Sequence, residues 1–310
     1  MTAAQNESRA ALLAGIGCYL IWGFVPLAMQ QVAHQGPGPW EILAHRVIFG
    51  AVTAGLFVLV AKQGSQVRRV LTEPKTLGLL FASAALIAVN WVVFIYAVTN
   101  GRVLESSLGY YINPLVNMAA GALLFREKLN RIALIAIGLA AVGVAVQTAA
   151  LGHLPFISLA LAFSFGAYGV VRKYVSADAQ TGLFVECLLL IVPCLIYVGW
   201  VEARGEGHFL ASPAATFWLI ASGPITAIPL ALFAWAARRM PLSAMGFLQF
   251  MAPTIGFFTG VLQGEPFRAL HAVSFAFIWA AAVVFIFGAV KTARAAKVAA
   301  AEGPVAEAQA

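Results

Sequence analysis

Charged side chains are scarce in this 310-residue chain, since Asp, Glu, Lys and Arg make up 10% of it and hydrophobic residues 62%. The mean hydropathy is +0.89. Such a chain has too little polar surface to coat a water-soluble domain, which excludes an ordinary cytosolic enzyme. Cysteine is rare as well: the three present lack the spacing of a metal site or a disulfide framework, so we expect neither a metal nor a cofactor.

Several motifs of catalysis and ATP binding are also missing. The chain has no GxxxxGK[ST] string for nucleotide phosphates, no HExxH string for zinc and no GxSxG nucleophile elbow. We therefore expect no ATP-driven pump and no enzyme. Lys and Arg outnumber Asp and Glu by 19 to 12, but these charges lie mostly in short connectors, so we expect no nucleic-acid partner.

Long apolar runs make up most of the remaining sequence. A membrane-spanning helix needs about 20 mainly apolar residues. Runs of this length, separated by short polar connectors, lie near 10–32, 39–61, 76–98, 104–125, 130–149, 154–171, 181–201, 214–236, 241–263 and 269–290. The sequence therefore predicts an all-α membrane protein with ten transmembrane helices.

The distribution of positive charge predicts the orientation. Cytoplasmic connectors are enriched in Lys and Arg. With the N-terminus inside, 15 of the 19 basic residues fall on the cytoplasmic side, and only Arg102, Arg204 and Arg268 fall in outer connectors. Both termini are therefore predicted to be cytoplasmic.

The two halves of the chain resemble each other. The string SLGYYINP at 107–114 is matched by GFLQFMAP at 246–253, and each is followed by a glutamate 12 or 13 residues after its proline. A repeat of five helices has an odd count, so the second copy enters the membrane in the opposite sense. We expect two inverted five-helix repeats, at 1–149 and 150–292, followed by a cytoplasmic tail at 293–310.

Five strings carry a resemblance to a known family. They are AHRVIF at 44–49, NWVVFIYAVTNGRVLESSLGYYINPLVN at 90–117, LAFSFGAYGVVRK at 161–173, AQTGLFVE at 179–186 and FLQFMAPT at 247–254. The chain resembles the EamA-type permeases of the drug/metabolite transporter superfamily, within their RarD branch. The resemblance implies two inverted five-helix bundles in the bacterial inner membrane and export of a small metabolite, amino acid or drug such as chloramphenicol.

A cluster of ionisable residues lies in the predicted second span. A charge inside hydrocarbon costs about 2.5–3.5 kcal/mol on insertion scales, so each one needs a partner or a watery cavity. Glu41 and His45 lie four residues apart on one helix face, with Arg46 next to them. The group either anchors the helix as an interfacial ion pair, or it handles substrate or protons, because arginine suits a carboxylate and histidine titrates near neutrality.

The predicted fourth span is unusually polar along its outer half, where four candidate binding residues lie: Glu105, Tyr110, Tyr111 and Asn113. Gly109 and Pro114 are expected to loosen this helix and to free backbone groups. The result is either a polar patch for a small zwitterion or a belt of interfacial aromatics.

Three more candidates lie in the third and seventh spans. Asn90 and Trp91 offer an amide and a stacking face, although helix-to-helix hydrogen bonding is the alternative for Asn90. Glu186 is expected either to pair with Arg172 or Lys173 or to carry a proton.

The remaining candidates concern the second repeat and possible gates. Gln249 stands where the repeat places Tyr110, so we expect it to line the cavity. Trp22 and Pro253 are expected gate or structural residues. Glu127 and Glu265 follow the matched helices, and we expect both to act as structural caps or gate contacts.

Together these patterns predict a secondary transporter that moves a small solute by alternating access, with protons as a candidate driving ion and lipid around it. An intramembrane enzyme and a lipid-handling membrane protein are the alternatives. The oligomeric state is left open.

Overall fold

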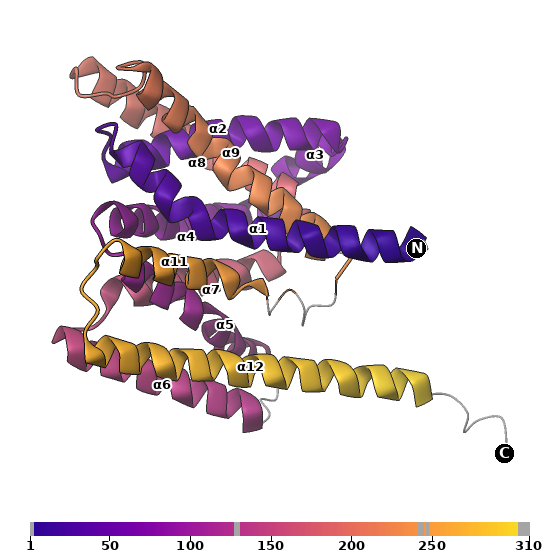
Figure 1. Cartoon of the computed structure of the whole chain (residues 1–310). Helices are drawn as coiled ribbons and strands as arrows, with labels where there is room; N and C mark the ends of the chain where they lie inside the picture. Colours follow the sequence, from indigo (N-terminus) through magenta and orange to yellow (C-terminus); the bar gives the residue numbers. More distant parts are fainter. Residues whose placement is uncertain (1–2, 127–130, 238, 241–244, 246–247, 303–310) are drawn as a thin grey trace.

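The computed structural model describes residues 3–126, 131–237, 239–240, 245 and 248–302. Within these ranges the regular structure is entirely helical (Figure 1). The helices are α1 (Ala3–Ala33), α2 (Pro39–Val60), α3 (Gly64–Thr72), α4 (Pro74–Thr99), α5 (Val103–Phe125), α6 (Arg131–Leu151), α7 (Phe156–Lys173), α8 (Ala179–Ala203), α9 (Pro213–Ala237), α11 (Met251–Leu262) and α12 (Ala269–Glu302).

Eight of these helices are long and apolar enough to cross a membrane: α1, α2, α4, α6, α7, α8, α9 and α12. The prediction of an all-α multi-pass membrane protein is thereby confirmed. The count of ten spans is not confirmed, because α5 is not among the eight. In the predicted ninth span, α11 covers twelve residues, too few to cross a bilayer alone, and residues 241–244 and 246–247 lie outside the described part of the chain.

A short helix that the sequence did not predict, α3, fills the connector between α2 and α4. Its Val70 is fully buried against Leu80 of α4 and against Val175 and Val185. The connector therefore packs onto the ends of the long helices instead of lying free in solvent.

The fourth predicted span differs from the expected broken helix. α5 runs without interruption from Val103 to Phe125, with Pro114 inside it. Gly109 has a packing role there, because a Cβ at this position would lie 2.7 Å from the backbone oxygen of Ser158 in α7. The glycine thus permits a close approach of α5 to α7.

Helices from the two halves of the chain are interleaved. α2 packs against α8 and α9, α1 against α9 and α11, and α7 against α4 and α5. α6 and α12 lie side by side at the lower edge of Figure 1. One buried cluster joins α1, α2, α4, α8 and α9, and a second joins α5, α6 and α12.

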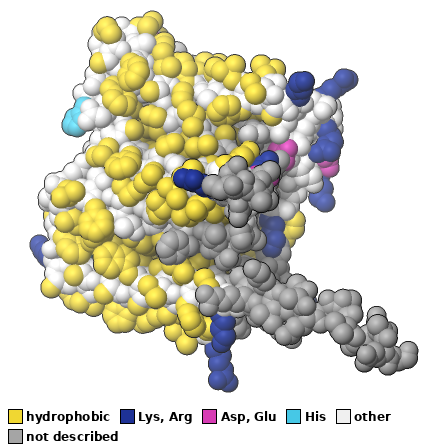
Figure 2. All heavy atoms as spheres, turned by 45° about the vertical axis from the view of Figure 1, so that its right-hand side comes forward, with side chains coloured by type: hydrophobic (Ala, Val, Ile, Leu, Met, Phe, Trp, Pro, Cys, Tyr) yellow, Lys and Arg dark blue, Asp and Glu magenta, His cyan; other side chains and the backbone are white. Residues whose placement is uncertain are grey.

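The surface fits a lipid environment. Apolar side chains are spread over much of the face in Figure 2, and most of the Lys and Arg side chains in that view lie toward its right-hand side. A broad apolar surface of this kind is rare on a soluble monomer.

Candidate functional site

Arg46 lies in a buried polar cluster formed by α2, α4 and α9. Its side chain is inside the protein, with the residue only 6% exposed. The Nε atom donates a hydrogen bond to Oγ1 of Thr226 at 2.7 Å. The guanidinium carbon lies 4.7 Å from the ring centroid of Trp91, a distance typical of a cation–π contact. Trp91 and Thr226, each more than 40 positions from Arg46 in the sequence, thus hold its side chain in place.

No acidic side chain in the described part of the chain neutralises Arg46. Within the described residues it forms no salt bridge, and its Nη1 atom is buried without a hydrogen-bond partner. A buried charge without a partner is expensive, and intramembrane charges are typical of substrate or ion pathways. A guanidinium group can bind a carboxylate with two parallel hydrogen bonds, so the cluster suits an anionic group.

Tyr110 and Asn90 form the second part of this cluster. The hydroxyl of Tyr110 donates to Oδ1 of Asn90 at 3.1 Å, and Asn90 is the chain neighbour of Trp91. The amide nitrogen of Asn90 donates to the backbone oxygen of Leu161 and to Oγ of Ser164, at 3.1 and 3.0 Å. Asn90 therefore bonds helix to helix and fixes the position of the Tyr110 hydroxyl.

A glycine on α9 brings Thr226 within reach of Arg46. A Cβ at Gly223 would overlap the backbone of Phe49 and Gly50 on α2. Because Gly223 has no side chain, the two helix backbones touch, and the hydroxyl one turn further along α9 meets the guanidinium group.

Glu41 and His45 do not join Arg46. The carboxylate of Glu41 accepts two hydrogen bonds from His208 in the α8–α9 connector, one from the backbone N–H at 2.7 Å and one from ring Nδ1 at 2.9 Å. The Nδ1 atom of His45 lies 3.0 Å from the backbone oxygen of Glu41, and its ring packs on Phe209. Glu41 thus ties the α8–α9 connector to α2. Its carboxylate faces His208, whereas Arg46 faces Thr226 and Trp91, so the three residues do not form one cluster.

Replacing Glu41 by alanine should release this connector. The change removes two hydrogen bonds to a charged acceptor, so the free energy of unfolding should fall by about 1.5–3 kcal/mol. Exchange of the His208 amide hydrogen should accelerate. Glu206→Ala is the matched control, because Glu206 pairs with Arg204 in an exposed ion pair that contributes little to stability. Equal effects of the two substitutions on exchange at His208 would contradict this role of Glu41.

Glu186 forms a separate buried network. Its carboxylate accepts hydrogen bonds from Oγ of Ser83 at 2.6 Å and from the hydroxyl of Tyr168 at 3.4 Å, and it lies 3.5 Å from Nη1 of Arg172. Gly182 leaves the space through which the Arg172 guanidinium passes. The structure thus provides the ion pair that was one of the two expectations for Glu186.

Aromatic rings connect the two networks. The ring centroid of Phe165 lies 5.7 Å from that of Tyr168 and 6.3 Å from that of Tyr110. Tyr168 contacts Glu186 and Tyr110 contacts Asn90, so one line of side chains runs from the Glu186 network to the Arg46 cluster.

Glu105 and Glu265 meet at the start of α5. Glu105 forms an ion pair with Arg102 at 2.7 Å. The carboxylate of Glu265 accepts hydrogen bonds from the backbone N–H groups of Val103 and Leu104, at 2.5 and 2.8 Å. Glu265 therefore caps the first turn of α5 from the α11–α12 connector. Burial is the main cause that raises the pKa of this carboxyl above its ordinary value, and the charge of Glu105 adds to the effect.

The raised pKa of Glu265 sets the sign of a pH effect. Its contribution to stability is fully present below the unfolded-state pKa and is lost as the pH rises through the folded-state pKa. In the wild type, ionisation of Glu265 should therefore lower the free energy of unfolding as the pH rises above about 4.3. Glutamine does not ionise, so Glu265→Gln should lack this contribution to the pH dependence. Glu206→Gln is a control of opposite sign, because the hydrogen bond from Arg204 lowers the pKa of Glu206. An unchanged pH profile in Glu265→Gln would contradict the effect.

Other candidates lie apart from Arg46. Tyr111 is buried in the second cluster, where its hydroxyl lies 2.6 Å from Oγ1 of Thr254 and its ring stacks on Phe250. The Oδ1 atom of Asn113 is buried without a partner among the described residues. Gln249 is half-buried in the turn before α11. The polar residues of α5 thus lie in different surroundings. Of the four candidates on this helix, Tyr110 is the one that joins the Arg46 cluster, and Tyr111 lies in the buried cluster with α6 and α12.

The expected gate residues have different surroundings. Trp22 packs against Tyr19 and Phe233. Pro253 lies in the first turn of α11, where a proline is tolerated because its missing N–H has no helical partner. Glu127 lies outside the described residues.

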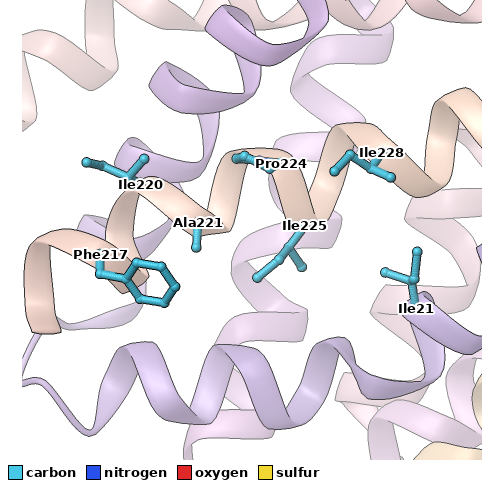
Figure 3. A pocket seen from close by; sticks show the side chains of 7 residues that line it. All are labelled: Ile21, Phe217, Ile220, Ala221, Pro224, Ile225 and Ile228. Atoms are coloured by element: carbon cyan, nitrogen blue, oxygen red, sulfur yellow. The ribbon is translucent and has the colours of Figure 1, made fainter.

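An apolar hollow of about 470 Å³ lies between α1 and α9 (Figure 3). Its lining residues are Ile21, Phe217, Ile220, Ala221, Pro224, Ile225 and Ile228. All of these side chains are hydrocarbon, so the hollow fits an acyl chain and offers no hydrogen bond to a polar solute.

Several residues of these networks were not predicted from the sequence, namely Ser83, Ser164, Tyr168, His208 and Thr226. Serine and threonine in apolar helices usually bond their own backbone, which gives no distinguishing signal. His208 lies in a connector, and nothing in its sequence neighbourhood indicates that it bonds to Glu41.

Comparison with known proteins places these residues in a family. Residues 9–148 match the EamA-like transporter family. The chain is 41% identical over 293 residues to a Protein RarD from Streptomyces exfoliatus, covering 94% of this chain and 92% of the relative. This chain belongs to the EamA-like transporter family, in its RarD branch. The family predicted from the sequence is thereby confirmed, and the chain is a membrane transporter.

Two further similarities agree with this assignment. An uncharacterized transporter from Vibrio cholerae is 36% identical over 299 residues, covering 96% of this chain and 98% of the relative. A solved crystal structure shares the fold with a TM-score of 0.59 at 18% identity, covering 88% of this chain and 96% of the other.

Proposed function

We propose that this transporter exports a small solute carrying a carboxylate, such as an amino acid or a related metabolite, and that Arg46 binds the carboxylate. The observation that carries the proposal is the buried Nη1 atom of Arg46, which has no partner among the described residues. A substrate carboxylate would supply the missing counter-charge.

The surroundings of Arg46 suit the rest of such a solute. The Tyr110 hydroxyl provides a polar contact, and the rings of Phe94 and Phe165 pack edge-on against Tyr110 to give an apolar wall. Chloramphenicol has no carboxylate and would leave Arg46 unpaired, so this cluster favours an acid over that drug.

The cluster is packed shut in this structure, with Arg46 and Trp91 only 6% and 7% exposed. A solute can reach Arg46 only if neighbouring helices separate, which is the movement that alternating access requires. The helix contacts support an inverted repeat: α2 pairs with α8 and α6 with α12, as equivalent helices would, and the pair α1–α9 mirrors the pair α4–α7. Units at 1–149 and 150–292 fit this arrangement.

Protons are the proposed driving ion. The Glu186 network supplies a buried carboxylate, and the line of aromatic rings connects it to the Arg46 cluster. The transporter is proposed to lie in the bacterial inner membrane with both termini cytoplasmic, in keeping with the bias of basic residues. Transport into sealed vesicles that ignores an imposed pH gradient would exclude proton coupling.

The purified protein in liposomes tests the function. Liposomes are loaded with a mixture of amino acids, related metabolites and chloramphenicol, and mass spectrometry follows which solutes exchange across the membrane. We expect saturable exchange of at least one carboxylate-bearing solute. Exchange of chloramphenicol alone would refute carboxylate recognition. No exchange by the folded protein would favour a lipid-like substrate, for which the apolar hollow between α1 and α9 is the supporting observation.

A further inference from the structure

A second cavity lies at the start of α5, remote in sequence from Arg46. It has a volume of about 260 Å³, and its polar lining consists of Arg102, Glu105, Gln147, Glu265 and His271. These residues come from α5, α6, α12 and the two connectors at the same end of the bundle. The paired helices α6 and α12 lie at an edge of the bundle in Figure 1, so the cavity is close to surrounding lipid.

Three lining residues carry buried polar atoms without partners among the described residues. They are Oε2 of Glu105, Oε1 of Gln147 and Nε2 of His271. Gln147 is 4% exposed, so bulk solvent does not reach its side chain in this conformation. Unsatisfied buried polar atoms are costly and rare, and three around one cavity indicate a site for a ligand.

The hydrogen bonds of neighbouring groups define what each atom offers. Glu105 uses Oε1 for Arg102, which leaves Oε2 as a free acceptor. The backbone N–H of Arg268 donates to Nδ1 of His271, so the ring proton lies on Nε2, which becomes a donor. The cavity therefore presents two oxygen acceptors and one N–H donor.

The charge balance of the cavity is negative. Arg102 contributes one positive charge, Glu105 and Glu265 contribute two negative charges when ionised, and the His271 tautomer is neutral. The side chain of Arg268 is exposed and does not line the cavity. One bound cation would neutralise the site. No group of three metal-ligating side chains was found in the described part of the chain, so a hydrogen-bonding cation fits better than a metal ion.

We propose that this cavity binds a primary ammonium group that has an oxygen atom two carbons away. The ammonium group donates hydrogen bonds to Oε2 of Glu105 and Oε1 of Gln147, and the neighbouring oxygen accepts one from Nε2 of His271. The headgroup of phosphatidylethanolamine and free ethanolamine both have this chemistry. The proposal is independent of substrate binding at Arg46.

Thermal unfolding of the full-length protein in nanodiscs tests the proposal and separates the two sources. One set contains phosphatidylethanolamine and phosphatidylglycerol, and the other contains phosphatidylcholine and phosphatidylglycerol in the same proportions. The quaternary ammonium of choline has no N–H to donate. We expect the ethanolamine lipid to raise the midpoint of unfolding by about 2–4 °C. Free ethanolamine added to phosphatidylcholine nanodiscs, with free choline as its control, tests the soluble source.

The shift must depend on the cavity. Gln147→Leu and Glu105→Gln should each abolish it, whereas Gln263→Leu, which changes an exposed glutamine at the same end of the bundle, should keep it. A shift with the lipid alone assigns a headgroup site, and a shift with free ethanolamine assigns a soluble amine. The absence of both shifts, or a shift that persists in Gln147→Leu and Glu105→Gln, overturns the proposal.

Discussion

Replacing Arg46 by methionine should lower solute exchange by at least about 30-fold, because losing one partner of a buried charge pair costs about 2–5 kcal/mol. The same change should leave the free energy of unfolding unchanged or raise it. Methionine fills a similar volume and removes a buried, unpartnered Nη1 whose desolvation costs about 1–3 kcal/mol. Thr226 keeps its hydrogen bond to the backbone oxygen of Ser222. Exchange and thermal unfolding are measured on the same preparation.

Arg204→Met is the matched control for this substitution. Arg204 also lies over a tryptophan, with its guanidinium carbon 4.9 Å from the ring centroid of Trp200, but it is exposed and pairs with Glu206. Exchange by Arg204→Met should equal that of the wild type. A well-folded Arg46→Met protein with full exchange would show that Arg46 only anchors its helix.

Replacing Gly223 by alanine should lower the free energy of unfolding by about 3 kcal/mol, at the upper end of the usual cost of overpacking. The added Cβ would overlap the backbone of Phe49 and Gly50, which cannot move aside as a flexible side chain can. The helices α2 and α9 must therefore separate, which pulls Thr226 away from Arg46, and solute exchange should fall as well.

Gly138→Ala is the control for the glycine substitution. A Cβ at Gly138 on α6 meets no atom within 4 Å, and alanine favours a helix by about 0.5–1 kcal/mol over glycine. We expect this variant to be as stable as the wild type or slightly more so in thermal unfolding. Equal losses at Gly138 and Gly223 would contradict the close contact of α2 with α9.

The sequence predicted what depends on local hydropathy. The apolar runs gave the long helices to within a few residues, and pairing of Glu186 with Arg172 was among the alternatives that the sequence offered. The family was recognisable from strings such as AHRVIF. α3 was not predicted, because a nine-residue segment with two arginines resembles a connector in a hydropathy profile.

The parts that depend on contacts between distant helices could not be predicted. Arg46, Trp91 and Thr226 come from three helices, and no spacing in the sequence brings them together. Proximity along one helix grouped Glu41 with His45 and Arg46, but it gave no sign that the carboxylate of Glu41 bonds to His208, 167 residues away. The spacing of residues in the sequence indicates which face of a helix each one occupies. It does not indicate which other helix packs against that face.

Comparing each acid with its methyl ester tests carboxylate binding at Arg46 most directly. Liposomes containing wild-type protein or the Arg46→Met variant are offered a mixture of amino acids and the same mixture as methyl esters, and mass spectrometry follows the exchange. Wild-type protein should exchange at least one acid with saturation and discriminate strongly against its ester, whereas Arg46→Met should lose this discrimination. Equal exchange of acid and ester by the wild type, or the same preference for the acid in Arg46→Met, would contradict carboxylate binding at Arg46.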